Sequence, residues 1–439
     1  MIWTSLPERL LKRAAMVEPV ERKAAILAFS LNFVLLGTYY ILRPLRDTMG
    51  TVFGVARLQD LFTGTFVLIF LSAPLFSWAA SRVRLSRFLP GVFCFLLANL
   101  LFFYALFHIA PHSKWVAGAY FCWFSSINLI LISVFWTLMA DTFSAGQAKR
   151  LYGLIAAGGS LGAISGPLIT TSLAVRIGID GLFLIAIAGF SIVILLMQLL
   201  IREKERLLAS GEDTQRTRLD HALPGNPFRG FTLLWKSAYM MGQAAFMLLM
   251  TWIATLLYFM QAGLIARTYS AIEQRTDAFA NVDLFVNVST VLILIFGLGA
   301  VFRRFGVTAS LVLSPLLMVL ACAGVMVAPT LLMVQAARSL QRISQYAIAR
   351  PSREVLFTVV DQQSKYKAKN VIDTVVYRFG DLTAAWMQAG LRAGGLGLIG
   401  VVAFGVGVSA AWGLVAAGLG RRYEAIAGAH RDRALTAIA

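Results

Sequence analysis

Long apolar stretches alternate with short polar connections along almost the whole chain. A helix needs about 20 apolar residues to cross a bilayer, and stretches of that length predict twelve membrane-spanning helices. Their expected ranges are 25–46, 58–80, 88–108, 115–140, 151–175, 180–201, 231–262, 283–301, 307–327, 330–349, 370–391 and 396–419. We therefore expect an all-α membrane protein.

The only long polar connection follows the sixth predicted helix, so the helices divide six plus six. The expected parts are an amphipathic segment (1–24), an N-terminal six-helix bundle (25–201), a cytoplasmic linker (202–230), a C-terminal six-helix bundle (231–420) and a cytoplasmic tail (421–439). Charges on both sides of short apolar runs in the first segment are typical of a helix lying on the membrane surface.

Composition and charge agree with this topology. Of the 439 residues, 59% are hydrophobic and 14% are charged, which excludes an ordinary soluble domain. The net charge is +18, and with the N-terminus inside, the inside segments hold 27 of the 39 Lys and Arg residues against six in the outside loops. Basic loops stay in the cytoplasm, so both termini are expected there, and the charge gives no reason to expect a nucleic-acid partner.

The sequence offers little for catalysis or metal binding. Residues 158–162 (GGSLG) fit a nucleophile pattern, but that motif requires a strand-to-helix turn and a histidine partner, and here it lies in an apolar helix. The four histidines lack metal-ligand spacing, and the three cysteines suggest no disulfide framework. We expect no enzyme, no metal and no cofactor.

Ionisable residues inside apolar helices are the more informative feature. An Arg or Asp at mid-membrane costs roughly 2.5–3.5 kcal/mol on insertion scales, so such residues normally face a cavity or a partner. The candidates on helix 1 are Tyr39, Arg43, Arg46 and Asp47; helix 4 ends in Asp141; helix 10 carries Arg338 and Arg342; helix 11 carries Asp373, Tyr377, Arg378 and Asp381.

Two interpretations of these charges remain open. Arg43 with Asp47, and Arg378 with Asp381, have the spacing of local ion pairs on a helix. Arg338 and Arg342 have no acidic residue within a turn, so they need acids from another helix or an anion. Arginine's planar fork suits phosphate and carboxylate, which favours a basic cavity that binds an anion.

A stripe of glycines and two short loops bear on the fold. Gly158, Gly162 and Gly166 leave one face of helix 5 bare, which predicts the close approach of another helix. The segment GAISGP (162–167) and the basic loops at 79–88 and 299–307 resemble elements of the major facilitator superfamily.

Three stretches together resemble the ATP/ADP translocase family of nucleotide transporters. They are ILRPLRD (41–47), FWTLMADTFSAGQAKRLYGLIAAGGSLG (135–162), and a segment with Pro351, Arg353-Glu354, Lys365, Lys367, Lys369, Ile372-Asp373, Arg378 and Gly380. The resemblance implies a major-facilitator-type bundle in a bacterial inner membrane. It also implies that Arg46, and Lys367 or Lys369, take part in binding the substrate, although topology alone would also make the loop at 365–369 basic.

The chain departs from that family where FCWFSSIN (121–128) and YFMQAG (258–263) lack its acidic residues. The expectation is therefore a secondary active transporter of a small organic anion, a nucleotide or another phosphorylated solute, that works as a monomer among membrane lipids. Asp47, Asp141, Asp373 and Asp381 are candidate coupling or gating residues, because shielding from water can raise the pKa of a carboxyl group. The alternative is a receptor or scaffold of the same fold that binds an anionic ligand or a partner without transporting it.

Overall fold

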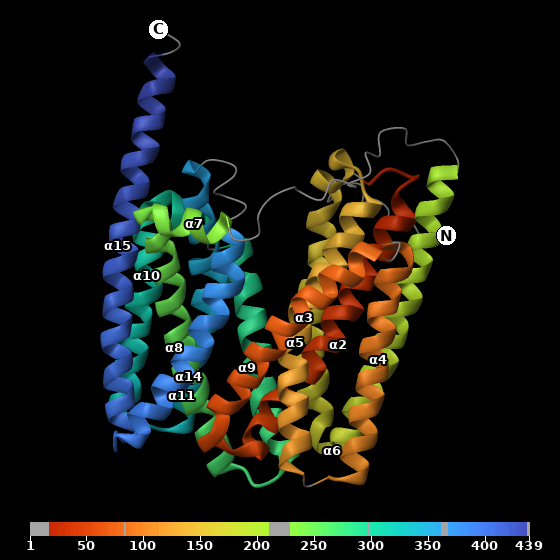
Figure 1. The fold of residues 1–439 in the computed structure, drawn as a ribbon, viewed down its shortest axis with the longest axis horizontal. Helices are drawn as coiled ribbons and strands as arrows, with labels where there is room; N and C mark the ends of the chain where they lie inside the picture. The colour runs from red at the N-terminus through yellow and green to blue at the C-terminus, as the bar shows by residue number, and fades with distance from the viewer. Residues whose placement is uncertain are drawn as a thin grey trace. The chain divides into compact units, whose positions relative to one another are not determined.

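The computed structural model describes residues 17–82, 85–111, 113–209, 229–296, 298–360 and 368–436. Throughout these ranges the secondary structure is helical with short connections, and they contain no β-strand (Figure 1). The predicted all-α class is confirmed. Most of the predicted amphipathic segment and of the predicted linker lies outside the described residues, so the proposed domain boundaries stay a prediction.

The described residues form two compact units. The first gathers residues from 1–53, 67–223 and 269–284, and the second gathers residues from 54–66, 224–268 and 285–439. Unit 1 contains α2 (Arg22–Gly54), α4 (Leu85–Ile109), α5 (Lys114–Thr142) and α6 (Ala145–Ala209). The helices α3 (Leu58–Arg82) and α9 (Ile272–Phe296) each contribute residues to both units.

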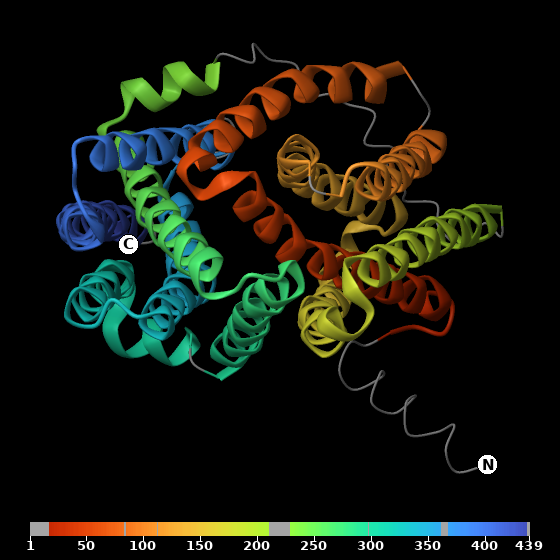
Figure 2. The same cartoon turned by 90° about the horizontal axis from the view of Figure 1, so that it is seen from below.

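Unit 2 is built around α8 (Ala238–Thr268). Its other elements are η1 (Val55–Arg57), α7 (Arg229–Lys236), α10 (Leu298–Val327), α11 (Leu331–Ser344), η2 (Gln345–Ala349), α12 (Arg350–Leu356), η3 (Phe357–Val359), η4 (Ile372–Val376), α14 (Tyr377–Ala393) and α15 (Leu398–Thr436). Within this unit α8 lies between α11 and α14 (Figure 2), and polar contacts join it to both.

Glycines divide two of the long helical stretches. Gly178 (φ 67°) interrupts α6 and Gly306 (φ 74°) interrupts α10. A residue that has a Cβ rarely adopts a positive φ, so glycine is favoured at both breaks. The break at Gly178 falls between the predicted helices 151–175 and 180–201.

Eight stretches among the described residues are long and apolar enough to cross a membrane. Two of them, Arg22–Ser72 with 51 residues and Gly146–Arg206 with 61, have length for two crossings each. The helical runs α11–η2–α12 and η4–α14 are not among the eight. The arginines and aspartates in these two runs lower their mean hydropathy. When both runs are counted as spans, the fold is consistent with twelve membrane crossings.

Several predicted helix boundaries were wrong. The helix expected at 25–46 continues to Gly54, and the helix expected at 396–419 continues to Thr436. The helix expected at 283–301 runs from Ile272 to Phe296; the polar residues between Ile272 and Asp283 are typical of a loop, so the apolar pattern did not reveal its start. The helix expected at 231–262 is divided into α7 and α8 around Ser237.

The glycine stripe of α6 packs closely against another helix, as predicted, and that helix is α2. A Cβ added at Gly162 would lie 2.2 Å from the carbonyl oxygen of Phe33, and one at Gly166 would lie 2.4 Å from that of Gly37. The hydroxyl of Thr170 also donates to the carbonyl oxygen of Ile41 at 3.3 Å. The backbones are therefore in direct contact, which fixes the position of the helix that carries Arg43 and Arg46.

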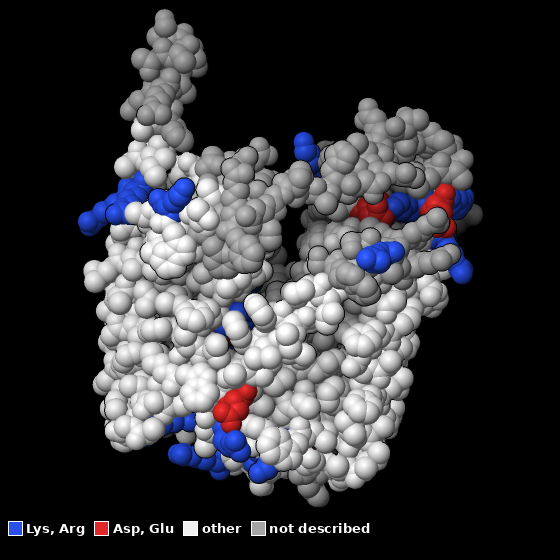
Figure 3. Space-filling view, viewed as in Figure 1, with Lys and Arg blue, Asp and Glu red and all other residues white. Residues whose placement is uncertain are grey.

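Uncharged side chains cover a wide part of the surface of unit 2 along α15. Figure 3 shows this surface below a group of basic side chains. Leu316, Leu320 and Leu414 contribute exposed apolar side chains to the unit's surface, and Arg421 and Arg422 are exposed on α15. This distribution suits an apolar belt in contact with lipid tails.

Candidate functional site

In unit 1, α2 carries two arginines that lie on aromatic rings. The guanidinium carbon of Arg46 lies 5.0 Å from the ring centre of Phe121. Its terminal nitrogens contact a carboxylate oxygen of Asp47 at 2.7 Å and the hydroxyl of Ser125 at 3.0 Å. These contacts hold the planar guanidinium in one orientation, and a cation stacked on a ring is attracted to its face.

Arg43 lies one turn before Asp47 but contacts a different helix. Its guanidinium carbon is 5.4 Å from the ring centre of Tyr40, and its Nη1 is 3.8 Å from Oδ1 of Asp283 on α9. The expected local pair of Arg43 with Asp47 was therefore wrong, since Asp47 contacts the adjacent Arg46 instead. Neighbouring residues on a helix seldom face each other, but the arginine stem is long enough to bend back.

Tyr39 lies close to the same arginines but faces an aromatic cluster. Its ring stacks on Phe124 with centres 5.1 Å apart and planes 13° apart, and it meets Tyr40 edge to face at 5.3 Å. Asn32, two turns earlier on α2, donates to the carbonyl oxygen of Ile155 on α6 at 2.9 Å. Contacts with α5 and with α6 therefore hold the polar face of α2 in place.

In unit 2, Arg338 on α11 is positioned by neutral acceptors. Its Nη1 donates to the carbonyl oxygen of Ala254 at 2.8 Å and to Oε1 of Gln341 at 2.5 Å. Its guanidinium carbon lies 5.7 Å from the ring centre of Tyr258. These two acceptors and the ring hold the guanidinium in one orientation.

Arg342 lies one turn after Arg338 and is only 5% exposed. Beside it, Nε2 of Gln341 donates to Oε1 of Gln345 at 2.7 Å, where the helix widens into the π-helical turn η2. π-Helical turns are rare and are found frequently at functional sites. A second one, η4, begins with Ile372 and contains Asp373.

Arg378 and Asp381 form the local pair that their spacing predicted. Nη1 of Arg378 lies 3.5 Å from Oδ2 of Asp381, and the guanidinium also lies over the ring of Tyr377 at 5.6 Å. Oδ1 of Asp381 accepts a hydrogen bond from Thr255 on α8 at 3.3 Å. Ala254 and Thr255 are adjacent, so α11 and α14 bring Arg338 and Asp381 to the same turn of α8.

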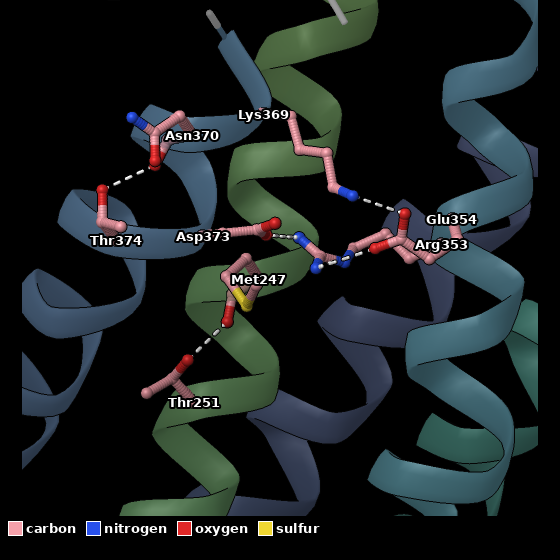
Figure 4. A network of polar contacts seen from close by, with 8 residues as sticks. All are labelled: Met247, Thr251, Arg353, Glu354, Lys369, Asn370, Asp373 and Thr374. Atoms are coloured by element: carbon pink, nitrogen blue, oxygen red, sulfur yellow. Dashed lines mark hydrogen bonds and ion pairs between the residues drawn. The ribbon is translucent and has the colours of Figure 1, made fainter. Parts of the chain in front are cut away.

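A further charged group joins α12 to η4 (Figure 4). Arg353 is 4% exposed, and its Nη1 contacts Oδ1 of Asp373 at 2.5 Å. Lys369 contacts Glu354 at 2.6 Å, and Glu354 lies 3.9 Å from Nη2 of Arg353. Lys369 is therefore an ion-pair partner in this structure, and Lys367 lies outside the described residues.

Asp141 has a contact of its own with α6. It lies near the end of α5, where its side chain is 42% exposed and accepts a hydrogen bond from Lys204 on α6. This contact joins the end of α5 to α6.

The charge of the polar helices in unit 2 is unbalanced in the sequence itself. Residues 331–393 contain nine Lys and Arg residues against four Asp and Glu residues. Carboxylates within this segment can therefore neutralise fewer than half of its cations.

Comparison with protein-family models assigns the fold. The model described as Major Facilitator Superfamily matches residues 25–349. The chain belongs to the major facilitator superfamily. Comparison with curated protein sequences gives no match.

Several solved transporter structures share the fold at low sequence identity. A bacterial homologue of the iron transporter ferroportin, in an inward-facing state, has a TM-score of 0.61 at 12% identity, covering 93% of this chain and 99% of that one. A POT family transporter in complex with 5-aminolevulinic acid has a TM-score of 0.64 at 12% identity, covering 91% and 96%. The nucleoside transporter NupG, as a mutant, has a TM-score of 0.55 at 14% identity, covering 93% and 99%.

Two residues that form ion pairs in the structure, Arg353 and Asp283, are not among the candidate site residues predicted from the sequence. In the sequence, Arg353 stands out only as part of a family motif, and Asp283 lies at the very start of a predicted helix. The spacing of Thr276, Asp283 and Asn287 could have identified Asp283 as a site residue, because steps of seven and four residues place all three polar side chains on one helix face. All three are buried.

Proposed function

We propose that this major facilitator protein is a secondary active transporter that moves a small organic anion by alternating access. The observation that supports the anion most strongly is the group of arginines in unit 2. Arg338, Arg342 and Arg378 lie on helices of a membrane fold, where charged side chains are expensive, and Arg342 is buried. Such sites commonly serve a substrate or ion pathway.

The form of the side chains favours a phosphorylated or carboxylated solute. A guanidinium presents several N–H groups in one plane and can grip two oxygens of one phosphate or carboxylate. Arg43, Arg46 and Arg338 each also lie on an aromatic ring, which fixes the plane of the fork. Tyr39, Tyr377, Lys367 and Lys369 complete the proposed substrate-binding set, and a nucleotide is one member of this class of solute.

The energy for transport comes from exchange or from an ion gradient. The sequence carries no P-loop motif Gly-x-x-x-x-Gly-Lys-Ser/Thr that would bind ATP as a fuel. Asp47, Asp373 and Asp381 are the proposed coupling or gating residues with the closest arginine contacts, at 2.7, 2.5 and 3.5 Å. Breaking any of these ion pairs would release an arginine for another anion.

The proposed location is the inner membrane of a bacterium, with both termini in the cytoplasm. The apolar spans support a multi-pass membrane protein. The excess of Lys and Arg in alternate loops supports the orientation.

The proposal is tested with purified protein in two steps. A thermal-shift screen with nucleotides, sugar phosphates and dicarboxylates first finds anions that stabilise the protein, because a ligand that binds only the folded state raises its melting temperature. Proteoliposomes are then loaded with each stabilising anion and assayed for exchange and for uptake driven by a pH gradient. Exchange or gradient-driven uptake is expected; stabilisation without any flux would instead indicate a receptor, and neither effect with any anion would contradict the proposal.

A further inference from the structure

The contact between α2 and the first turns of α9, both in unit 1, is polar along its length. Nη1 of Arg275 donates to the hydroxyl of Thr51 at 3.2 Å, and the hydroxyls of Thr276 and Thr48 are hydrogen bonded at 3.0 Å. Arg43 then meets Asp283 at 3.8 Å. The residue numbers fall on α2 as they rise on α9, so the two helices run antiparallel through three successive polar contacts.

This contact differs in kind from the contact of α2 with α6. On the α6 side, glycines bring the two backbones together, and a Cβ at Gly158 would lie 2.5 Å from the carbonyl oxygen of Phe29. On the α9 side, hydroxyls and charged groups meet through their side-chain ends. Hydrogen bonds between membrane helices are individually weak, so a contact of this type can be broken and remade.

The two sides also differ in their position along the chain. Helix α6 belongs to the same run of six helices as α2, whereas α9 follows the long connection at 202–230 and belongs to the second run. Alternating access requires that some contacts between the two runs break in each cycle. The hydroxyl and ion-pair contacts between α2 and α9 are suited to that role, and the glycine contact is not.

Asp283 supplies the only carboxylate among these three contacts. It is 1% exposed, although a charged carboxylate is expensive to bury without a nearby cation. The other charged residues on the first turns of α9 are Glu273, Arg275 and Asp277, and Asp277 accepts a hydrogen bond from Asn281 of its own helix. Asp283 alone among the α9 carboxylates has a charge contact with α2 in the described part of the chain.

We propose that Asp283 is a positioning residue whose charge closes the α2–α9 contact through Arg43, and that this contact opens during the transport cycle. Because the proposed function assigns Arg43 to the transported anion, the inference rests on that function where it connects the contact with substrate. It also gives Arg43 a second partner, so that closing the contact and binding an anion use the same guanidinium.

The test measures opening directly with a cysteine at a buried position of the contact. Thr276 is fully buried, so Thr276→Cys reacts with a water-soluble maleimide only when α9 separates from its neighbours. Cys94 and Cys122 are replaced by alanine, and the buried Cys322 of α10 is kept as an internal reporter of general unfolding. We expect Asp283→Asn to raise the labelling rate at position 276 about tenfold or more and to leave the rate at Cys322 unchanged.

Matched variants separate the ion pair from a general effect on the helix. Asp277→Asn makes the same chemical change on the same helix and should leave labelling at the background rate. Asp283→Glu keeps the charge, and the exchange of Arg43→Asp with Asp283→Arg restores an ion pair, so both should label close to background. The inference is wrong if Asp283→Asn labels no faster than Asp277→Asn, or if Cys322 accelerates equally.

This measurement needs no substrate, so it distinguishes the two proposals. Faster labelling of Asp283→Asn in a protein that carries no anion across liposomes would support the opening contact and contradict the transport function. Unchanged labelling in a protein that does exchange anions would contradict the role of Asp283 alone.

Discussion

Arg353 and Asp373 meet at 2.5 Å and connect two segments that are separated by twenty residues of chain. The guanidinium lies in a buried position at α12, and the carboxylate belongs to the π-helical turn η4 (Figure 4). The pair therefore joins the end of α11–η2–α12, which carries Arg338 and Arg342, to the start of η4–α14, which carries Arg378. The arginines proposed to bind the anion depend on it for their relative positions within unit 2.

Removing one member of this pair should destabilise unit 2 measurably. Asp373→Asn leaves the buried Arg353 without its carboxylate, and we expect a loss of about 1–3 kcal/mol, below the range for fully buried pairs because the Asp373 side chain is 33% exposed. Lys369→Ala removes the neighbouring, more exposed ion pair with Glu354 and should cost less than about 1 kcal/mol. Melting temperatures in one detergent compare the two; an equal change for both would contradict the structural role of the Arg353 pair.

The close packing of α2 on α6 gives a second prediction. Gly162→Ala places a Cβ 2.2 Å from the carbonyl oxygen of Phe33, which forces the helices apart and should cost about 1–3 kcal/mol. Gly153→Ala, on the same helix, meets nothing within 4 Å and should be neutral or slightly stabilising, since alanine favours a helix. Expression yield and thermal stability in detergent measure the difference, and equal behaviour of the two variants would show that the backbones are not in contact.

The candidate coupling carboxylates should differ in their effect on transport. Asp381 lies between Arg378 and Thr255 with a side chain 17% exposed, whereas Asp141 is 42% exposed beside Lys204. Asp381 contacts an arginine of the proposed site, whereas Asp141 contacts a lysine near the end of α5. We therefore expect Asp381→Asn to lower flux at least about tenfold, because it removes the carboxylate partner of Arg378, while Asp141→Asn changes flux less than about twofold. Uptake rates in proteoliposomes decide this, and a larger effect of Asp141→Asn would reverse the assignment.

Much of the fold could be predicted from the apolar pattern, because a membrane requires helices of a fixed length. The glycine stripe of α6 was also predicted correctly, since three missing side chains at four-residue spacing leave only one way to pack. The start of α9 was not, because Glu273, Arg275 and Asp277 resemble a loop when the partner helix is unknown. Polar helix faces that meet inside a membrane protein cannot be recognised by hydropathy alone.

The site was predicted in part for a similar reason. Spacing along one helix correctly predicted the ion pair of Arg378 with Asp381. It also predicted an ion pair of Asp47 with Arg43, but in the structure the partner of Asp47 is Arg46. An arginine can reach forward, backward or across to another helix, and only the packing decides which. The π-helical turns at η2 and η4 shift the face of every residue that follows them, and no periodicity in the sequence announces them.

The central claim, that arginines within the membrane helices bind the transported anion, is tested most directly by exchange flux in proteoliposomes for Arg338→Gln beside Arg57→Gln. Arg57 is half-exposed at η1 and pairs with Asp60 one turn away, so it provides a control with the same chemical change in the same unit. We predict that Arg338→Gln abolishes both exchange and stabilisation by the anion, that Arg338→Lys recovers only part of each, and that Arg57→Gln retains both. Full exchange by Arg338→Gln, at the rate of the Arg57 control, would contradict the account.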